Sequence, residues 1–547
     1  MAIVFLKQSV NVRESIRGDI RGLDRALQQS YTDTIADEYR FLADLLINQG
    51  RILEAQQILD LLKLEELREF TRNARTIGST DGIALNDAEK QILQDYGTLI
   101  AFGRKIYECE QTNCSELDRL LQQRRNLSEE YDRRIKTLIA TVRDNRQRDD
   151  FFYDPRYLNE TAREIVATPG TVLIYPFVQD DKLTLLWTAS GEIVGSKTIP
   201  VSRQQLGETV VRFRALLQNP DLNNLRELQA VGKQLYDWLI QPLEAELQAK
   251  LAQQGQSMTH LVFAQDRILR YVPMAALFDG ENYLVERYIL STILSAELTD
   301  MDDRLTPGTD RNPMLALGLS QSVAGLNPLP NVEEELDAIV RQASNDPRGI
   351  YPGQDFLNQD FTLPALSDNL RNSRIVHIAT HGKFVAGQPE QSYLVMGNGE
   401  PLTIEQINSL GSDLRNVHLV VLSACETALG GPGADGIEVA GISSYFLAAN
   451  RASAVMASLW LVNDASTSQL MQQFYQNLAN GMTKADALRQ AQLFLLNGNQ
   501  PNPTGTDRTG NVTIGIRDIR TGLPPEVSSR LSHPYYWAPF ILIGNGL

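Results

Sequence analysis

The stretches "RIVHIATHG" (374–382) and "VHLVVLSAC" (417–425) decide the fold. Each is a short run of β-branched and aliphatic residues that ends in small or polar residues, as a buried strand does. Further runs of this kind recur along the chain, with helical segments between them. Strands that alternate with helices predict right-handed crossovers and a mostly parallel sheet flanked by helices. Functional residues are expected where such strands reach their carboxyl ends.

The remaining elements of this α/β region follow from the same periodicities. Consecutive antiparallel strands are predicted at "TVLIYPFV", "KLTLLWTA" and "EIVGSKTIPV", because turn residues separate these three runs. Further strands are predicted at "THLVFAQD", "NPMLALGLS", "ASAVMASLW" and "YYWAPFILIG". Helices are predicted over residues 204–251, 332–343, 436–449, 464–480 and 483–496.

The first 150 residues read as helices alone. The sequence predicts a helical hairpin over residues 33–67. The hairpin resembles one tetratricopeptide repeat, because the following residues occur in the order typical of that repeat: Tyr39, Leu42, Ala43, Leu46, Gly50, Ala55, Leu59 and Leu62. Between Asp87 and Asp150, apolar residues recur at threes and fours amid Arg and Glu, which predicts a second, charged helical hairpin. This second pair either supports its neighbours or forms a partner-binding arm. The expected fold is therefore α/β with an all-α amino-terminal region.

Composition narrows the class of protein. The chain has no apolar run of about 18 residues, which predicts no membrane span, and its opening "MAIVFLKQSV" lacks the pattern of a secretory signal. Its three cysteines cannot form a disulfide framework, and Cys109 and Cys114 lack a nearby histidine to complete a zinc site. The net charge of −16 argues against nucleic-acid binding. We therefore expect a cytoplasmic protein with no metal, cofactor, nucleic acid or membrane partner.

Two strand ends carry residues that could take part in catalysis. "RIVHIAT" ends at His381 and Gly382, and "VHLVVLSA" ends at Cys425. If these strands are neighbours, both side chains project into one crevice, where a thiol with a pKa of about 8.5 would find its proton acceptor. Backbone N–H groups of Gly382 and Cys425 could then hold an oxyanion. The other interpretation is a small buried thiol and a histidine that merely ends a strand.

Several motifs resemble those of one peptidase family. "HIATHGKF", "VVLSACETALG", "SLWLVNDAST" and "YYWAPFILIGN" look like motifs of the CHAT family, caspase-like cysteine peptidases often attached to tetratricopeptide repeats and related to separases. "RILRYVPMAALFDGENYLVERY" is similar to the family's segment upstream of the site. The resemblance implies a caspase-like sheet with His381 as the catalytic histidine and Cys425 as the nucleophile. His377, inside the strand, then takes a structural role.

The same resemblance implies a division of the chain into three domains. Residues 1–150 would be the helical region, 151–305 a degenerate caspase-like half without the catalytic pair, and 306–547 the catalytic half.

The resemblance also points to a substrate-binding residue. Asp464, in "SLWLVND", lies near the segment where separases carry an acidic residue that recognises arginine before the scissile bond. This implies a preference for a basic residue there, arginine before lysine. An equal alternative is that Asp464 caps a helix beginning at Ala465. Separases also have an acid directly after the tryptophan, whereas this chain has Leu461.

The resulting hypothesis is a cysteine endopeptidase that cleaves protein substrates and is regulated by a protein partner through its helical region. Cys425 would attack the substrate carbonyl, and His381 would pass the proton to the leaving amine. One alternative is a non-cleaving interaction scaffold with a peptidase-like domain, and another is a Cys-dependent acyl transferase. A nucleotide hydrolase is disfavoured, because the glycine-rich residues 430–441 lack the Lys and Ser/Thr of a P-loop. A glycosidase is disfavoured because no paired carboxylates are found.

Overall fold

The structure is a computed structural model that divides into two compact units. The first comprises Met1–Glu66 and Gly78–Asn159, and the second Leu67–Ile77 and Glu160–Leu547. The structure describes residues 1–20, 25–71, 82–112, 114–144, 160–191, 193–343, 346, 348–384, 391–423, 426–427, 436, 445–447, 451–460, 464–498 and 531–547. Within these residues, no helix is both long and apolar enough to cross a bilayer.

The first unit is helical, as predicted. Its helices are α1 (Ala2–Ile20), α2 (Arg25–Asn48), most of α3 (Ile52–Thr71), α4 (Asp87–Thr112) and α5 (Leu117–Asp144). The predicted break at Gly50 separates α2 from α3, and this residue has a φ of 75°, which glycine adopts without strain. The residues of the tetratricopeptide-like pattern pack inward, with Tyr39, Leu42, Ala43, Leu46, Ala55, Leu59 and Leu62 all buried. The predicted helical hairpin over residues 33–67 is thus confirmed.

A buried cluster of four charged residues joins three of these helices. Arg51 donates to both carboxylate oxygens of Glu54 at 2.6 Å and to Glu89 at 2.7 Å. Lys7 of α1 lies 2.9 Å from Glu89 and also contacts Glu54. Burial opposes charging of Glu89, but Arg51 and Lys7 outweigh burial and lower its pKa. The cluster therefore holds the start of α4 against α1 and α3.

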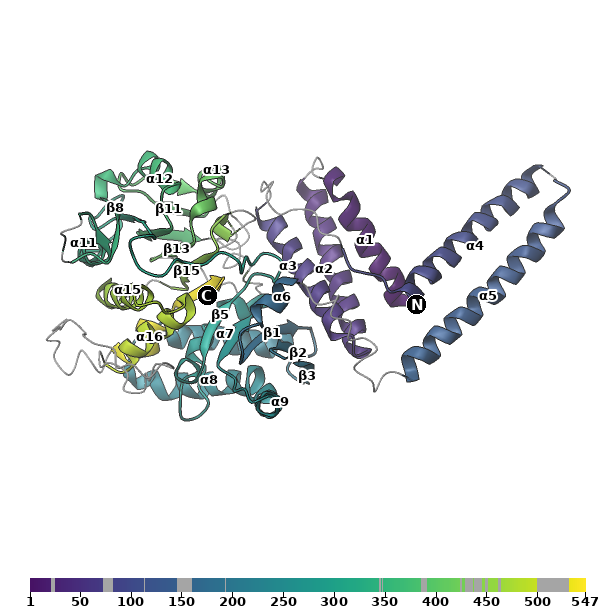
Figure 1. The fold of residues 1–547 in the computed structure, drawn as a ribbon, viewed down its shortest axis with the longest axis horizontal. Helices are drawn as coiled ribbons and strands as arrows, with labels where there is room; N and C mark the ends of the chain where they lie inside the picture. The colour runs from purple at the N-terminus through teal and green to yellow at the C-terminus, as the bar shows by residue number, and fades with distance from the viewer. Residues whose placement is uncertain are drawn as a thin grey trace. The chain divides into compact units, whose positions relative to one another are not determined.

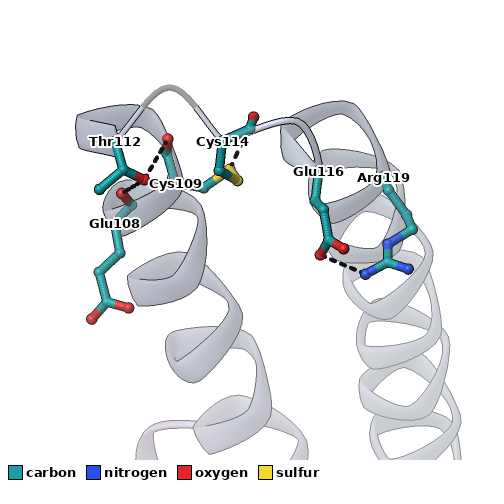
Figure 2. Close-up of a disulfide and its surroundings, with 6 residues drawn as sticks. All are labelled: Glu108, Cys109, Thr112, Cys114, Glu116 and Arg119. Carbon is teal, nitrogen blue, oxygen red and sulfur yellow. Dashed lines mark hydrogen bonds and ion pairs between the residues drawn. A yellow bond between two sulfur atoms is a disulfide. The ribbon is translucent and has the colours of Figure 1, made fainter.

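Helices α4 and α5 form the second predicted hairpin and run side by side over most of their length (Figure 1). A disulfide between Cys109 and Cys114 closes the turn that joins them. Figure 2 shows this bond beside the end of α4, where the Thr112 hydroxyl donates to the carbonyl of Glu108 at 2.9 Å. This bond was not predicted from the sequence, because three cysteines exclude a disulfide framework but not one local pair.

The second unit is built on a sheet of twelve described strands, in the order β3-β2-β1-β4-β5-β16-β15-β13-β9-β6-β8-β7. Their bounds are β1 (Thr171–Val178), β2 (Leu183–Ala189), β3 (Ile193–Ile199), β4 (His260–Phe263), β5 (Ile289–Thr292), β6 (Met314–Gly318), β7 (Val340–Arg341), β8 (Tyr351–Leu357), β9 (Ile375–Ala379), β13 (Leu419–Leu422), β15 (Ala454–Ser458) and β16 (Phe540–Gly544). Strands β1, β2 and β3 pair antiparallel as predicted, and β16 is antiparallel to β15. The other neighbours are parallel.

Helices flank this sheet, so the expected α/β fold class is confirmed. They include α6 (Glu160–Ile165), α7 (Arg203–Leu217), α8 (Leu225–Leu239), α9 (Gln241–Gln253), α10 (Leu284–Arg287), α11 (Asn331–Ile339), α12 (Leu363–Leu370), α13 (Ile404–Ser409), α15 (Asp464–Ala479), α16 (Lys484–Leu496) and α18 (Pro534–Trp537). The sheet runs continuously across residue 305, and the proposed division into a degenerate and a catalytic half stays a prediction.

Some element boundaries were wrong. The helix predicted over 332–343 ends at Ile339, because the next two residues join the sheet as β7. The strand predicted over 535–544 begins only at Phe540, since Pro534 opens the short helix α18 at a position where proline is favoured. The helical stretch predicted over 204–251 is confirmed, and it consists of the three helices α7, α8 and α9. Of the helix predicted over 436–449, residues 445–447 are helical and Gly436 is not, while the rest lies outside the described residues.

A second polar network closes the amino-terminal edge of the sheet. His418, just before β13, has Nδ1 2.7 Å from Asp303 and Nε2 2.8 Å from the Nζ atom of Lys484. Arg374, just before β9, contacts the same Asp303 carboxylate at 2.8 Å. Burial lowers the pKa of Lys484 to about 7 and that of His418 to about 4. At neutral pH the His418 ring is therefore uncharged, so it can donate to Asp303 and accept from Lys484.

Candidate active site

The strands named at the outset are neighbours in the sheet. Parallel β9 and β13 pair in register, with Ile378 opposite Leu422, and β6 lies on the other side of β9. Beyond their carboxyl ends, β10 (Gly382–Phe384) and β14 (Glu426–Thr427) pair in parallel within a second sheet of order β12-β11-β10-β14. The other members of this sheet are β11 (Tyr393–Val395) and β12 (Pro401–Thr403). Cys425 itself lies outside the described residues.

Backbone and side-chain hydrogen bonds fix the position of His381. The Thr380 hydroxyl donates to the carbonyl of Val395 at 2.6 Å, and the Val395 N–H donates to the carbonyl of His381 at 2.8 Å. Gly382 follows as the first residue of β10 and pairs with Leu394. His381 therefore lies at the point where β9 has ended and the smaller sheet begins, and its side chain is partly exposed.

The imidazole of His381 is oriented by a backbone carbonyl. Its Nε2 atom lies 2.8 Å from the carbonyl oxygen of Asn327. A carbonyl oxygen can only accept, so Nε2 carries the hydrogen of this bond. In the neutral ring the lone pair is then on Nδ1, which makes no hydrogen bond with the described residues. The geometry thus prepares His381 to accept a proton through Nδ1.

The segment that carries Asn327 is itself held in place. It follows β6, and the N–H groups of Ser320 and Gln321 donate to the side-chain oxygen of Asn358 at 2.9 and 3.0 Å. Asn358 has a φ of 52°, a left-handed conformation that asparagine tolerates better than most residues. Asn327 was not predicted from the sequence, because a backbone carbonyl is present in every residue type.

His377 lies inside β9 and is fully buried, four residues before His381. Its Nδ1 atom is 3.1 Å from the Tyr475 hydroxyl of α15, and its Nε2 atom is 2.9 Å from a carboxylate oxygen of Glu335 on α11. The side chain thus packs against α11 and α15, which cover this face of the sheet.

Asp464 is the first residue of α15, one position before the expected helix start. Its side chain lies outside the described part of the structure, so its substrate-binding and capping roles both stay predictions. The preceding segment is anchored by Arg214 of α7, which the sequence analysis missed. This fully buried guanidinium donates to the carbonyl of Leu459 at 2.9 Å and lies 5.1 Å from the ring of Trp460.

Metal ligands are not gathered in the described part of the chain. No group of three or more His, Cys, Asp or Glu side chains is placed there to hold an ion.

Residues 229–545, more than half of the sequence, match the CHAT domain family model. The chain belongs to the CHAT-domain family. The resemblance drawn from the sequence motifs is thereby confirmed. The matched region includes both β9 and β13 with the segments that follow them, so His381 and Cys425 lie within the CHAT domain.

Comparison with individual proteins gives more distant likenesses. Tetratricopeptide repeat protein 28 of Mus musculus is 25% identical over 361 residues, which cover 57% of this chain but 13% of that protein. The crystal structure of the Arg specific cysteine proteinase gingipain R is similar with a TM-score of 0.34 and 8% identity, covering 57% of this chain and 68% of that chain. A complex of the Porphyromonas gingivalis RgpB pro- and mature domains gives the same score and identity, covering 57% and 70%. Likenesses this distant assign neither substrate nor activity.

Proposed function

We propose that this CHAT protein is a cysteine endopeptidase that uses His381 and Cys425. The observation that carries the proposal is the contact between His381 Nε2 and the Asn327 carbonyl. This contact leaves Nδ1 as the basic nitrogen at the carboxyl edge of β9. The residues that follow Cys425 pair with those that follow His381, with Glu426 opposite Lys383. A parallel pair in this register supports the two side chains acting on one substrate.

The chemistry would run in two stages. His381 Nδ1 takes the thiol proton of Cys425, and the thiolate attacks the carbonyl carbon of the scissile peptide bond. The oxygen that becomes negative is stabilised by the backbone N–H groups of Gly382 and Cys425. His381 then gives its proton to the leaving amine as the C–N bond breaks and a thioester remains. Water, deprotonated by His381, hydrolyses the thioester and restores the thiol.

On the substrate side, we propose that Asp464 selects arginine, then lysine, before the scissile bond. A carboxylate in a water-poor pocket makes a charge-assisted, two-point contact with a guanidinium, which lysine cannot match. Asp464→Asn is the informative substitution, because asparagine can still cap α15 but carries no charge. Arginine preference that survives this change would contradict the assignment and leave the catalytic pair untouched.

The first unit is proposed to regulate cleavage by binding a protein partner, and the cytoplasm is the compartment expected from composition. Two features support a binding role: the tetratricopeptide-like hairpin and the exposed apolar residues Tyr96, Ile100 and Tyr107 along α4.

Cleavage of a peptide library by the purified chain tests the proposal. Parent protein is compared with Cys425→Ala and His381→Ala, and unfolding curves confirm that all three are folded. We expect the cysteine variant to lose cleavage completely and the histidine variant nearly so. Cleavage by Cys425→Ala near the parent level would contradict the proposal. If no peptide is cleaved but an acyl group reaches another acceptor through Cys425, the protein is a transferase. If Cys425 captures no peptide electrophile, the scaffold alternative stands.

A further inference from the structure

One buried carboxylate touches both of the strands that lead to the proposed catalytic pair. Glu335 of α11 is 1% exposed. Its Oε1 atom lies 2.9 Å from Nε2 of His377 on β9. The same atom accepts a hydrogen bond of 3.4 Å from the hydroxyl of Ser423, which follows β13. His377 precedes His381 by four residues, and Ser423 precedes Cys425 by two. Glu335 therefore joins the two strands just below their functional ends.

The ring of His377 is held from its other side by Tyr475. Burial, and then the charge of Glu335, raise the pKa of Tyr475 well above its ordinary value, so the phenol stays protonated and can donate to Nδ1. The hydrogen of the neutral ring is then on Nε2, toward Glu335. Nε2 makes no hydrogen bond with the described residues, so its 2.9 Å contact with Oε1 is electrostatic.

The helix that carries Glu335 also continues the segment that orients His381. Asn327, whose carbonyl accepts from His381, lies four residues before α11 begins at Asn331. Residues 327–335 thus supply one contact to the His381 ring, one to the strand beneath it and one to the residue that leads to Cys425. Because these contacts come from one continuous segment, a shift of α11 would move them together. Helix α11 also packs against α15, which carries Tyr475.

We propose that Glu335 is a positioning residue of the peptidase site, which sets the relative placement of the ends of β9 and β13 through His377 and Ser423. The inference rests on the proposed function. The physical reason is geometric: reacting groups must meet within a few tenths of an ångström, and a displacement of about 1 Å can cost about 100-fold in rate. A buried carboxylate that contacts both strands resists such displacement. Its second oxygen, Oε2, has no hydrogen-bond partner among the described residues, so stability alone gives little reason for a carboxylate here.

The test compares Glu335→Gln with Glu334→Gln, which removes a carboxylate from an exposed position of the same helix. Ser423→Ala removes the hydroxyl that reaches Glu335, and Ser423→Thr keeps it. Three quantities are measured for each variant: kcat and KM for a cleaved peptide, the rate at which iodoacetamide alkylates Cys425, and the urea midpoint of unfolding. Mass spectrometry locates the alkylated cysteine.

We expect Glu335→Gln to lower kcat about tenfold with KM changed less than about twofold, because the peptide still binds but the pair is misplaced. Alkylation of Cys425 should change at least about threefold. Ser423→Ala should behave alike, Ser423→Thr should recover most of the loss, and Glu334→Gln should match the parent. The double variant Glu335→Gln/Ser423→Ala should be no worse than Glu335→Gln alone, since Glu335→Gln already disturbs the contact that Ser423→Ala removes.

Two results would overturn the inference. One is a Glu335→Gln variant that unfolds at lower urea but keeps parent kcat, KM and alkylation rate, which is a structural role alone. The other is equal behaviour of Ser423→Ala and Ser423→Thr, which decides the question even if Glu335→Gln fails to fold. Failure of the proposed function is separate: the parent would then cleave nothing, while the alkylation rates would still report whether Glu335 positions Cys425.

Discussion

The two edges of the twelve-stranded sheet differ in how fully their polar side chains are hydrogen-bonded. At the amino-terminal edge, Asp303, His418 and Lys484 form an ordered chain in which each group has a partner of the right kind. At the carboxyl-terminal edge, His381 uses one ring nitrogen and leaves the other without a partner among the described residues. Satisfied buried groups serve stability, and unused hydrogen-bonding capacity serves chemistry. The comparison therefore predicts that substitutions at the two edges separate activity from stability.

The largest effect is expected for His381→Ala. The rate constant kcat/KM should fall by about 100-fold or more, which is the usual contribution of a general acid–base. The urea midpoint should stay within error of the parent, because the ring is partly exposed and makes one hydrogen bond with the described residues. Tryptophan fluorescence is a selective probe for this measurement, since Trp187, Trp238, Trp460 and Trp537 all lie in the second unit. A large loss of stability would mean that this edge is structural too.

The converse is expected for His418→Leu at the amino-terminal edge. Removal of the ring leaves Lys484 with only the Leu547 carbonyl as an acceptor among the described residues and Asp303 without one donor, and a buried polar group that loses a partner costs about 1–3 kcal/mol. The free energy of unfolding should fall by that amount, while kcat per folded molecule stays unchanged. Arg371→Ala is the matched control, because its ion pair with Asp413 lies near the same edge with Arg371 72% exposed. Exposed pairs contribute at most about 1 kcal/mol.

A smaller effect is expected from pH. The pKa of Lys484 is lowered by burial from its ordinary value to about 7, so above pH 7 the unfolded chain binds the proton that the folded chain has lost. Stability of the second unit should therefore rise between pH 7 and pH 9, by no more than about 1.4 kcal/mol per pH unit. Urea unfolding followed by tryptophan fluorescence measures this slope. Lys484→Met should flatten it, and an equal slope in that variant would assign the effect to other groups.

Much of the fold could be predicted from the sequence, because buried strands consist of continuous runs of apolar residues. "TVLIYPFV" matches β1 to the residue, and β9 and β13 lie where their runs predict. Strands β8, β10 and β12 were missed, since a partly exposed or three-residue strand leaves no such run. Their places depend on pairing with distant segments, which residue type alone does not specify.

The candidate site divides in the same way. His381 was found because its side chain type and its place at a strand end coincide. Asn327 acts through its backbone, so no residue pattern could have indicated it. Glu335 did leave a signal that was overlooked: it shares the buried face of α11 with Val332, Leu336 and Ile339, at helical spacing. A charged residue on an apolar face costs free energy unless it has partners, and so points to a specific role.

The smallest effect is expected in the first unit, at the disulfide between Cys109 and Cys114. The bond closes a loop of six residues at the turn between α4 and α5, for which the chain-entropy relation gives about 2 kcal/mol at most. Because the Cys114 N–H also donates to the Cys109 carbonyl at 2.9 Å, the turn keeps a hydrogen bond when the sulfur atoms part. Reduction by dithiothreitol should therefore speed amide exchange at the ends of α4 and α5 and leave both the fluorescence midpoint and kcat unchanged.

Cys109→Ser/Cys114→Ser should reproduce the reduced protein without added thiol, which excludes an effect of dithiothreitol on Cys425. A drop in kcat shared by the reduced protein and this double variant would instead show that the helical hairpin communicates with the sheet, and would make its turn the first place to look for the regulatory partner.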